Sequence, residues 1–368
     1  MIVGVVSETK SDEYRVGLLP VGAQLLTQDG HTVLLQKGAG IGSGFEDQAY
    51  VHAGVKLADT AAEVWAKADM VIKVKEPQAE EIALLRQDQI LFCYFHFAAA
   101  RELTEGCLKA RIASVAYETL FDREGRLPLL TPMSEVAGKM AIQEGAKTLE
   151  RPMKGRGILL GGVPGVAPAD VVILGGGVVG TNAAFVAAGM GANVTVMDVN
   201  LDRLRQLDTM MPANVTVIYS DPYAVTDYVS RADLVVGAVL IPGRRAPSLI
   251  SRKLVSRMRA GSVLVDVAID QGGCAETSRP TTHQDPTYLV DEVVHYCVTN
   301  MPGAVSRTSS QALCNATLPY ARELARLGVD GFIAVDAGHG AALNTRGGKI
   351  THRAVAETFT DLPAALEG

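Results

Sequence analysis

Short hydrophobic runs alternate along the chain with longer stretches in which apolar residues recur at helical spacing. In the first 125 or so residues this pattern predicts strands separated by helices, which is typical of a parallel sheet with right-handed crossovers. We expect one doubly wound unit here, with strands at 2–6, 31–36, 70–75, 90–95 and 113–117 and helices at 21–29 and 61–66.

Residues 127–132 read as a crossing segment, because prolines stand near both ends. A helix is expected from Ser134 to Glu150, with Ser134 as its N-cap. A loop rich in glycine and proline, residues 155–168, leads into the second half of the chain.

The second half repeats the alternation of strands and helices. Six strands make a full dinucleotide-binding sheet of the doubly wound kind. They are expected at 171–174, 194–198, 215–219, 234–238, 263–267 and 294–298, followed by a helix at 311–327. Residues 328–368 hold too few strand signals for a third domain, so we expect them to return to the first unit.

A glycine motif opens the second unit. Gly175, Gly177 and Gly180 form G-x-G-x-x-G between a β-branched run and a small-residue helix, and Asp198 closes the next strand. The first glycine permits the tight turn, the second lets a pyrophosphate approach, and the third lets helix and strand pack closely. The helix N-terminus favours phosphate binding, and an acid at Asp198 favours NAD over NADP.

These elements predict an α/β fold with two Rossmann-like doubly wound domains. We expect an NAD-binding domain at 129–306, inserted into a discontinuous substrate domain formed by 1–128 and 307–368. Ligands of such sheets bind beyond the carboxyl ends of the strands. We therefore expect the reacting groups in a cleft between the two domains, which would close during catalysis.

The composition limits the classes of protein to which the chain could belong. A hydrophobic share of 48% with 20% charged residues describes a globular protein, and a net charge of -6 gives no support for nucleic-acid binding. The one basic cluster, Arg244 and Arg245, is too small for a phosphate-tracking surface. Five scattered cysteines without a C-x-x-C pair predict buried thiols such as Cys93 and Cys297, with neither a disulfide framework nor a metal site. No signal peptide or membrane span is indicated, so a cytoplasmic protein is expected.

Four polar residues stand at predicted strand ends. Arg15 follows the first strand, Lys75 ends MVIKVK, His96 follows ILFCYF, and Asp270 follows SVLVDVA. Arg15 and Lys75 offer charged donors to a carboxylate and a carbonyl, and His96 is a natural acid–base group. Asp270 would orient water or stabilise a cationic intermediate. The set suits hydride transfer on a small carboxylic acid.

Each residue also has a structural interpretation. Arg15 would be a solvated loop residue beside Glu13, and His96 a satisfied core histidine. Asp270 would cap the QGG turn. Lys75 would be a surface lysine at a strand end. Lys73 points to the same face of the strand as Lys75, so spacing alone does not choose between the two lysines.

Several long segments resemble bacterial L-alanine dehydrogenases, the alanine dehydrogenase/transhydrogenase N-terminal family, across nearly the whole chain. They are SETKSDEYRVGLLP, KVKEP, FHFAAARELTE, LPLLTPMSEVAG, GRGILLGGVPGV, DVAIDQGGC, RPTTH and TNMPGAV. The resemblance implies NAD-dependent oxidative deamination of L-alanine to pyruvate and ammonium, its reversal, and a homohexamer. It departs mildly at HFAAA, where the family more often has HLAA.

The resemblance also assigns roles to positions of this chain. It implies that Arg15 and Lys75 bind the substrate carboxylate and carbonyl, and that His96 works as the acid–base residue with Asp270 as its partner. It implies cofactor contacts at Ser134, Val178, Val179, Asp198, Arg203, Ser220, Val239, Leu240, Val267, Ala268, Ile269, Asp270, Arg279, Thr299, Asn300, Met301 and Pro302. Arg203 has an alternative interpretation as a solvated helix residue.

Two other functions remain open. One is an NAD-binding component similar to the soluble subunit of proton-translocating transhydrogenase, which lacks a histidine at the position of His96 and binds a membrane partner. The other is a relative that acts on a different amino or imino acid, such as a lysine–ketoglutarate reductase. The presence of both Lys75 and His96 weighs against the first, and the match through FHFAAA and DVAIDQGG favours a small side chain over the second.

Overall fold

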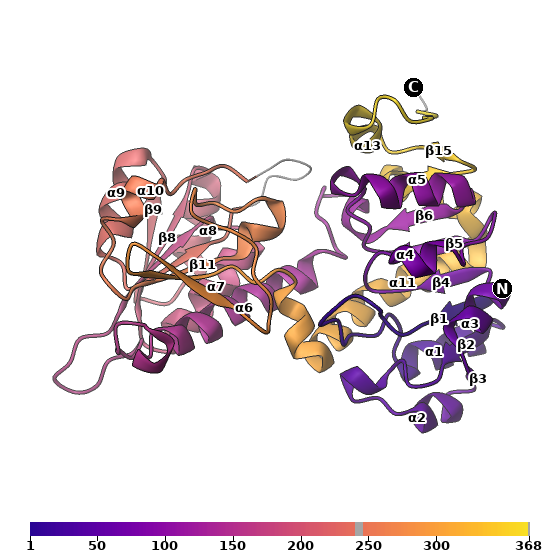
Figure 1. Cartoon of the computed structure of the whole chain (residues 1–368), viewed down its shortest axis with the longest axis horizontal. Helices are drawn as coiled ribbons and strands as arrows, with labels where there is room; N and C mark the ends of the chain where they lie inside the picture. The colour runs from indigo at the N-terminus through magenta and orange to yellow at the C-terminus, as the bar shows by residue number, and fades with distance from the viewer. Residues whose placement is uncertain (240–245, 367–368) are drawn as a thin grey trace. The chain divides into compact units, whose positions relative to one another are not determined.

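The computed structural model describes residues 1–239 and 246–366, so Leu240, Arg244 and Arg245 lie outside the described residues. The chain divides into two compact units, drawn together in Figure 1. Unit 1 comprises residues 1–133 and 303–368, and unit 2 comprises residues 134–302. From the sequence, we expect the domain limits at 128/129 and 306/307, a few residues from these.

Unit 1 contains an eight-stranded sheet in the order β15-β14-β6-β5-β4-β1-β2-β3. The strands from β3 to β6 are parallel, and β14 and β15 add antiparallel strands at the β6 edge. Because β1 lies between β2 and β4, the strand order reverses there, which is the switch point of a doubly wound sheet. The strands are β1 Ile2–Val5, β2 Thr32–Gln36, β3 Lys56–Ala58, β4 Met70–Ile72, β5 Ile90–Cys93, β6 Ala113–Ala116, β14 Leu343–Arg346 and β15 Lys349–Ile350.

Helices of unit 1 come from both ends of the chain. The longest, α11, has a non-helical residue at Gly328, and its Ser310 hydroxyl accepts a hydrogen bond from the Val16 N–H at 3.0 Å. The helices are α1 Pro20–Gln28, α2 Asp47–His52, α3 Ala61–Lys67, α4 Ala79–Ile82, α5 Arg101–Ala110, α11 Ser306–Ile333, α12 Ala337–Ala342 and α13 Arg353–Thr358, with short 3-10 turns η1 Ile41–Ser43, η2 Phe97–Ala99 and η3 Tyr117–Thr119.

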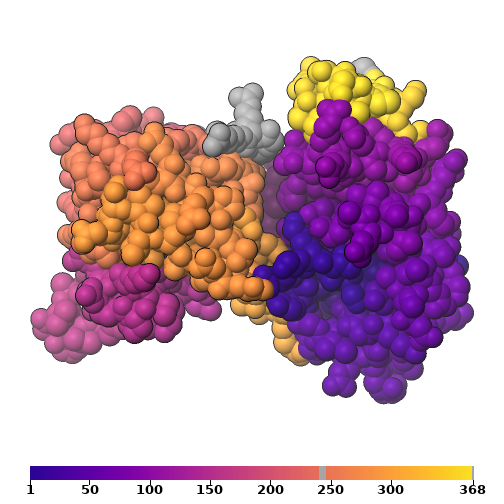
Figure 2. All heavy atoms as spheres, viewed as in Figure 1, coloured from indigo at the N-terminus to yellow at the C-terminus, as the bar shows by residue number. Residues whose placement is uncertain are grey.

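The C-terminal segment covers the end of the first sheet. Arg101 of α5 forms an ion pair with Asp361 and lies over the ring of Phe359 at 5.8 Å. Figure 2 shows these C-terminal residues, in yellow, against the purple surface of unit 1. Residues 343–361 therefore complete unit 1.

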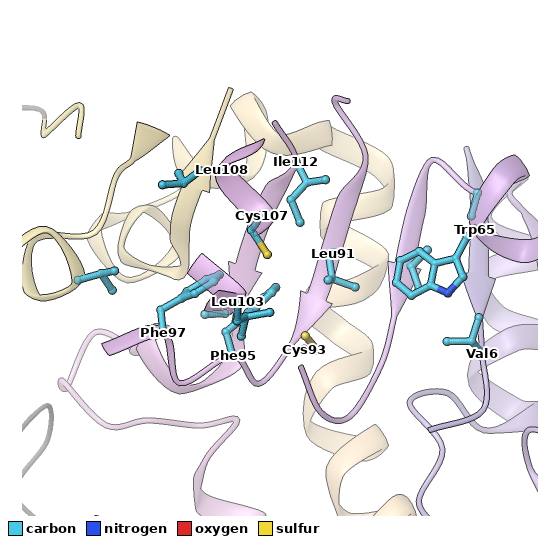
Figure 3. Packing of buried hydrophobic residues seen from close by; sticks show 14 of the residues in the cluster. Val6, Trp65, Leu91, Cys93, Phe95, Phe97, Leu103, Cys107, Leu108 and Ile112 are labelled. Atoms are coloured by element: carbon cyan, nitrogen blue, oxygen red, sulfur yellow. The ribbon is translucent and has the colours of Figure 1, made fainter. Parts of the chain in front are cut away.

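A hydrophobic core fills unit 1 on one side of its sheet. Phe95, Phe97, Leu103 and Cys107 are buried in it, as Figure 3 shows. The central strands β4 and β5 are buried along their whole length, as expected for parallel strands covered on both faces.

Unit 2 contains a seven-stranded sheet in the order β12-β13-β11-β10-β7-β8-β9. Its six parallel strands match the expected set, and the switch point lies between β7 and β10. A seventh strand, β12, was not predicted from the sequence and pairs antiparallel with β13. The strands are β7 Asp170–Leu174, β8 Asn193–Asp198, β9 Val215–Tyr219, β10 Leu234–Gly237, β11 Val263–Asp266, β12 Thr287–Val290 and β13 Val293–Tyr296.

The expected N-cap at Ser134 is wrong, because α6 already begins at Thr131 and Ser134 lies inside it. Pro132 is tolerated in the first turn of a helix, where its missing N–H would have no partner within the helix. The helices of this part are α6 Thr131–Thr148, α7 Val178–Gly189, α8 Leu201–Met210, α9 Pro222–Arg231 and α10 Arg252–Val255, with turns η4 Arg151–Met153, η5 Val267–Gln271 and η6 Met301–Val305.

Candidate functional site

Three predicted site residues of unit 1 surround Tyr94, which follows β5. The His96 ring stacks on the Tyr94 ring, with centroids 5.9 Å apart and planes 6° from parallel. The Lys75 Nζ lies 6.0 Å from the centroid of the same ring. Burial raises the pKa of the Tyr94 phenol, and the charge of Arg15 partly opposes this. Tyr94 therefore brings Arg15, Lys75 and His96 into one region.

Tyr94 was not among the predicted site residues, because it lies in an apolar run that reads as a buried strand. Only 3% of Tyr94 is exposed, and its hydroxyl donates a hydrogen bond to the Leu129 carbonyl at 2.5 Å. A phenol within such a run was the available signal, since a buried hydroxyl requires a partner.

The two lysines of MVIKVK have different environments. Lys73 is fully buried, and its Nζ lies 3.1 Å from Glu8 Oε2 and 2.8 Å from Glu81 Oε1. Burial lowers the pKa of Lys73, but the two carboxylates outweigh this and raise it to about 12. Lys75 is partly exposed. The structure therefore makes Lys73 a core charge and leaves Lys75 as the candidate for substrate.

Arg15 is not the solvated loop residue of the alternative interpretation, because only 2% of it is exposed. Glu13 accepts hydrogen bonds from Arg15 Nε at 2.6 Å and from Nη2 at 2.5 Å, and Met133 Sδ lies 3.0 Å from Nη1. Burial lowers the pKa of the guanidinium, and Glu13 more than reverses this. Arg15 is thus a permanently charged group with a fixed orientation.

His96 is exposed, which argues against a satisfied core histidine. Its backbone is left-handed, with φ 53° and ψ 41°, and its N–H donates to Glu118 Oε1 at 2.6 Å. Glu118 belongs to η3 and was not found from the sequence, because nothing in AYET indicates a partner 22 residues away in the chain.

The glycine motif of unit 2 has three distinct geometries. Gly175 has φ 102°, and a Cβ there would lie 2.6 Å from the Ala238 carbonyl oxygen. At Gly180 a Cβ would lie 1.8 Å from the Gly175 oxygen, whereas at Gly177 nothing lies within 4 Å. The turn is therefore tight at its first and third glycines and open at its second, which caps α7. This cradle fits a pyrophosphate at the helix N-terminus.

Asp198 and Arg203 both form hydrogen bonds with the backbone of this turn. Asp198 Oδ2 accepts the Gly176 N–H at 2.7 Å, and Arg203 Nε donates to the Gly176 carbonyl at 2.7 Å. Arg203 Nη2 also lies 2.6 Å from the Thr181 hydroxyl. Arg203 is thus a residue of helix α8 whose side chain is partly buried and hydrogen-bonded to the glycine turn and the start of α7, so it is not simply a solvated helix residue. Ser220 follows the neighbouring strand β9, and its N–H donates a hydrogen bond to the Asp198 carbonyl at 3.0 Å.

Ser134 lies on the side of α6 that faces this turn. A Cβ at Gly138 would lie 2.2 Å from the Val179 carbonyl oxygen, so α6 packs closely on the start of α7. Residues four apart share one face of a helix. Ser134 therefore lies toward the segment that carries Val178 and Val179, although it is no N-cap.

Of the remaining predicted cofactor residues, Val239 follows the carboxyl end of β10 and residues 299–302 follow that of β13, whereas Arg279 lies between η5 and β12. Val239, after β10, packs against a cluster that contains Ala268 of η5. Arg279 is exposed, with its guanidinium 4.1 Å from the Tyr288 ring centroid. The Thr299 N–H donates to the Thr281 carbonyl at 3.2 Å, and after it come Asn300, with φ 59°, and the buried Met301 and Pro302. Leu240 lies outside the described residues.

Asp270 is exposed on η5, next to Val267 and Ile269. The cap of this turn is Asp266 and not Asp270. Asp266 is fully buried and accepts hydrogen bonds from Ala268 N–H at 3.1 Å, Cys274 N–H at 2.8 Å and the Ser278 hydroxyl at 2.5 Å. Asp266 therefore holds the turn, and Asp270 is exposed on it.

Two cavities of unit 2 lie away from these residues. One of about 380 Å³ is lined by Asp170, Asn193 and Arg231, at the amino ends of β7 and β8. The other, about 300 Å³, lies beside Arg156 and Asp233. Because Gly175 follows the opposite end of β7, neither cavity is the glycine turn.

Within residues 1–239 and 246–366, no group of three His, Cys, Asp or Glu side chains has the geometry to hold a metal ion. No helix in the described part of the chain is long and apolar enough to cross a membrane. All five cysteines are buried free thiols, which confirms the expectation for Cys93 and Cys297.

Two doubly wound sheets, one of which has a glycine turn and an acid at the next strand end, place the chain among two-domain α/β proteins of the Rossmann type. Family models described as alanine dehydrogenase/PNT, N-terminal and C-terminal domain, match residues 4–137 and 141–353. The chain belongs to the alanine dehydrogenase/PNT family of oxidoreductases.

Similar proteins agree with this membership. Alanine dehydrogenase from Halomonas elongata is 54% identical over 359 residues, which cover 98% of this chain and 97% of that protein. A solved structure of L-alanine dehydrogenase is 51% identical with a TM-score of 0.95, covering 98% of this chain and 99% of its own. A transhydrogenase structure from Sinorhizobium meliloti is 25% identical with a TM-score of 0.83, covering 95% and 100%. The resemblance and the fold class are confirmed.

Proposed function

We propose that the chain catalyses the oxidative deamination of L-alanine to pyruvate and ammonium with NAD, and the reverse amination. The observation that carries the proposal is the grouping of Lys75, His96 and Arg15 around Tyr94. Two cations, of which Arg15 has a fixed orientation, suit a substrate carboxylate and carbonyl, and an exposed imidazole suits proton transfer. The similar proteins with more than 50% identity named above are alanine dehydrogenases.

NAD is the cofactor that we propose for unit 2. Gly175, Gly177 and Gly180 would hold the pyrophosphate with Val178 and Val179, and Asp198 would accept hydrogen bonds from the adenosine ribose. The other residues that we assign to the cofactor are Ser134, Arg203, Ser220, Val239, Leu240, Val267, Ala268, Ile269, Asp270, Arg279, Thr299, Asn300, Met301 and Pro302. Bound there, NAD would supply the acceptor for the hydride that leaves the substrate Cα.

The chain's own residues then bind the substrate and move protons. Arg15 and Lys75 orient the carboxylate and the carbon that becomes a carbonyl. His96, with Asp270 as its partner, takes a proton from the water that adds to the imine, and returns one to the amino group of the carbinolamine. Carbon–nitrogen cleavage then releases ammonium and pyruvate. Water supplies the oxygen of pyruvate, and the hydroxyl proton of the carbinolamine passes to the departing ammonia. The one net proton released is the proton that the substrate ammonium group loses when the imine forms.

We assign the substrate role to unit 1 and the cofactor role to unit 2. We also propose a homohexamer that works in the cytoplasm, since the resemblance implies the assembly and five buried free thiols suit a reducing compartment. The mass of the native particle, measured by light scattering, tests the hexamer. A dimer or monomer would contradict it.

The deciding experiment compares wild type with His96→Ala in NADH formation from L-alanine and NAD. We expect activity in the wild type, and its loss in the variant by at least about a hundredfold, while NADH binding is kept. Wild type that binds NADH but forms none with alanine would contradict the substrate. The same assay would then be repeated with other amino acids, and binding to a transhydrogenase-like partner would be tested. If the variant kept near wild-type turnover, only the role of His96 would be contradicted, and the assignment of the substrate would stand.

A further inference from the structure

His96 has a backbone that is uncommon for a residue with a side chain. Its φ of 53° and ψ of 41° lie in the left-handed region, between the end of β5 and the turn η2. Such a conformation costs free energy and persists only where the surroundings enforce it. The residues that hold the His96 backbone in this conformation therefore help to set the orientation of the imidazole.

Both neighbours of His96 are anchored in the core. Phe95 and Phe97 are each 1% exposed, and their rings stack with centroids 4.6 Å apart. Figure 3 shows the two rings within the hydrophobic cluster of unit 1. Because the flanking side chains point into the core, His96 between them is left outside it.

Glu118 supplies the polar half of this anchoring. Its Oε1 accepts hydrogen bonds from the His96 N–H at 2.6 Å and from the Phe95 N–H at 3.1 Å. Bonds from N–H groups to a carboxylate are stronger than those to a neutral acceptor. Glu118 itself is fixed by its neighbour Tyr117, which is buried and donates to the Lys73 carbonyl at 3.0 Å.

The next strand of the sheet repeats the arrangement. Glu8 accepts the Val74 N–H on Oε1 at 2.6 Å and the Lys75 N–H on Oε2 at 3.3 Å. Thus Lys75 and His96, on neighbouring strand ends, both donate their backbone N–H to a carboxylate from another part of unit 1. In both cases the preceding residue donates to the same carboxyl group.

We propose that Glu118 is a positioning residue for His96, which sets the left-handed backbone and so directs the imidazole onto Tyr94. This inference rests on the proposed function, because it assigns His96 the proton transfers. Glu118 reaches His96 through its backbone N–H. Its loss would therefore disturb the direction of the imidazole and leave the cofactor site of unit 2 as it is.

His352 also interacts with Glu118, so an effect through His352 must be distinguished from an effect through His96. Burial lowers the pKa of His352, and the charge of Glu118 partly opposes this. The Nδ1 of His352 is buried and has no hydrogen-bond partner among the residues that the structure describes. If Glu118 acted through His352, His352→Gln would reproduce the effect of losing Glu118.

The test uses Glu118→Gln, which keeps the shape and removes the charge, and Glu118→Ala, which removes the acceptor. Asp122→Ala is the matched control, because Asp122 Oδ1 also accepts two backbone N–H groups, from Glu124 at 3.0 Å and Arg126 at 2.9 Å. We expect Glu118→Ala to lower kcat by about tenfold or more and Glu118→Gln by less, with the KM for NAD unchanged in both. Asp122→Ala and His352→Gln should keep kcat.

Hydrogen exchange by mass spectrometry gives a readout that does not need turnover. We expect amides in the peptide around Phe95 and His96 to exchange about tenfold faster in Glu118→Ala, and those of residues 122–126 to do so in Asp122→Ala. Unchanged exchange around His96, or an unchanged kcat in a wild type that is active with alanine, overturns the proposal. A wild type that is inactive with alanine contradicts the proposed function instead. In that case the hydrogen exchange of the amides around His96 still tests whether Glu118 holds the His96 backbone.

Discussion

At the scale of single residues, environment separates groups that the sequence leaves equivalent. Lys73 and Lys75 lie two positions apart in a run that reads as one strand, so spacing alone gives them equal claims, although β4 ends at Ile72. In the structure Lys73 is enclosed by Glu8 and Glu81, whereas Lys75 lies beside the Tyr94 ring. A buried charge between two carboxylates supports the fold, and an accessible one near His96 is suited to substrate.

The two lysines therefore predict opposite phenotypes for one substitution. Lys73→Met leaves two buried carboxylates without their cation, which should lower the free energy of unfolding by about 3–5 kcal/mol. Lys75→Met should change it by less than about 0.5 kcal/mol and yet abolish NADH formation from alanine. Urea unfolding and the activity assay measure the two effects. Equal stability of both variants would contradict the assignment of Lys73 to the core.

At the scale of elements, the strand–turn–helix that begins with β7 was the part best predicted from the sequence. Each glycine has a local steric requirement that a motif records, and the structure places Gly175 and Gly180 where a Cβ would meet backbone oxygen. The start of α6 was predicted less well, because Ser134 has the residue type of an N-cap while Pro132 permits an earlier start. Glu118 could not be found, since its bond to His96 joins two separate strand ends.

Gly177 and Gly180 make a matched pair for this element. Gly180→Ala would place a methyl group 1.8 Å from the Gly175 oxygen, which should destabilise unit 2 by about 1–3 kcal/mol or more. Gly177→Ala meets no atom within 4 Å, so the fold should remain while the methyl group obstructs the pyrophosphate. We expect its NADH affinity to fall by about tenfold or more, measured by fluorescence titration. Unchanged affinity with intact folding would contradict the assignment of this turn to the cofactor.

At the scale of the whole molecule, both units use one strand order. In unit 1 it is β3-β2-β1-β4-β5-β6, and in unit 2 it is β9-β8-β7-β10-β11-β13. The alternation of apolar runs and helices predicted the six parallel strands of unit 2 and five of the six in unit 1, but it missed the short strand β3. It also did not predict β12, β14 and β15, because these short antiparallel strands contain polar residues and depend on a neighbouring strand for their pairing.

Buried histidines should make the stability of the whole molecule depend on pH. Burial lowers the pKa of His295 from its ordinary value of 6.5, with weaker opposing effects from the Val293 carbonyl and Asp266. The neutral ring is well satisfied, with Nδ1 3.0 Å from the Val293 carbonyl oxygen and Nε2 2.8 Å from the Thr277 hydroxyl. The unfolded chain therefore binds a proton at a higher pH than the folded one does.

It follows that stability falls as the pH drops below the unfolded value of 6.5 and continues to fall until the folded pKa is reached. His31 and His352, whose pKa values burial also lowers, act in the same direction. We expect the thermal midpoint of the wild type to fall between about pH 7.5 and about pH 5.5, and the fall to be smaller in His295→Gln. The comparison cancels the groups that both proteins share. An equal fall in the variant would mean that His295 takes up its proton equally well in the folded state.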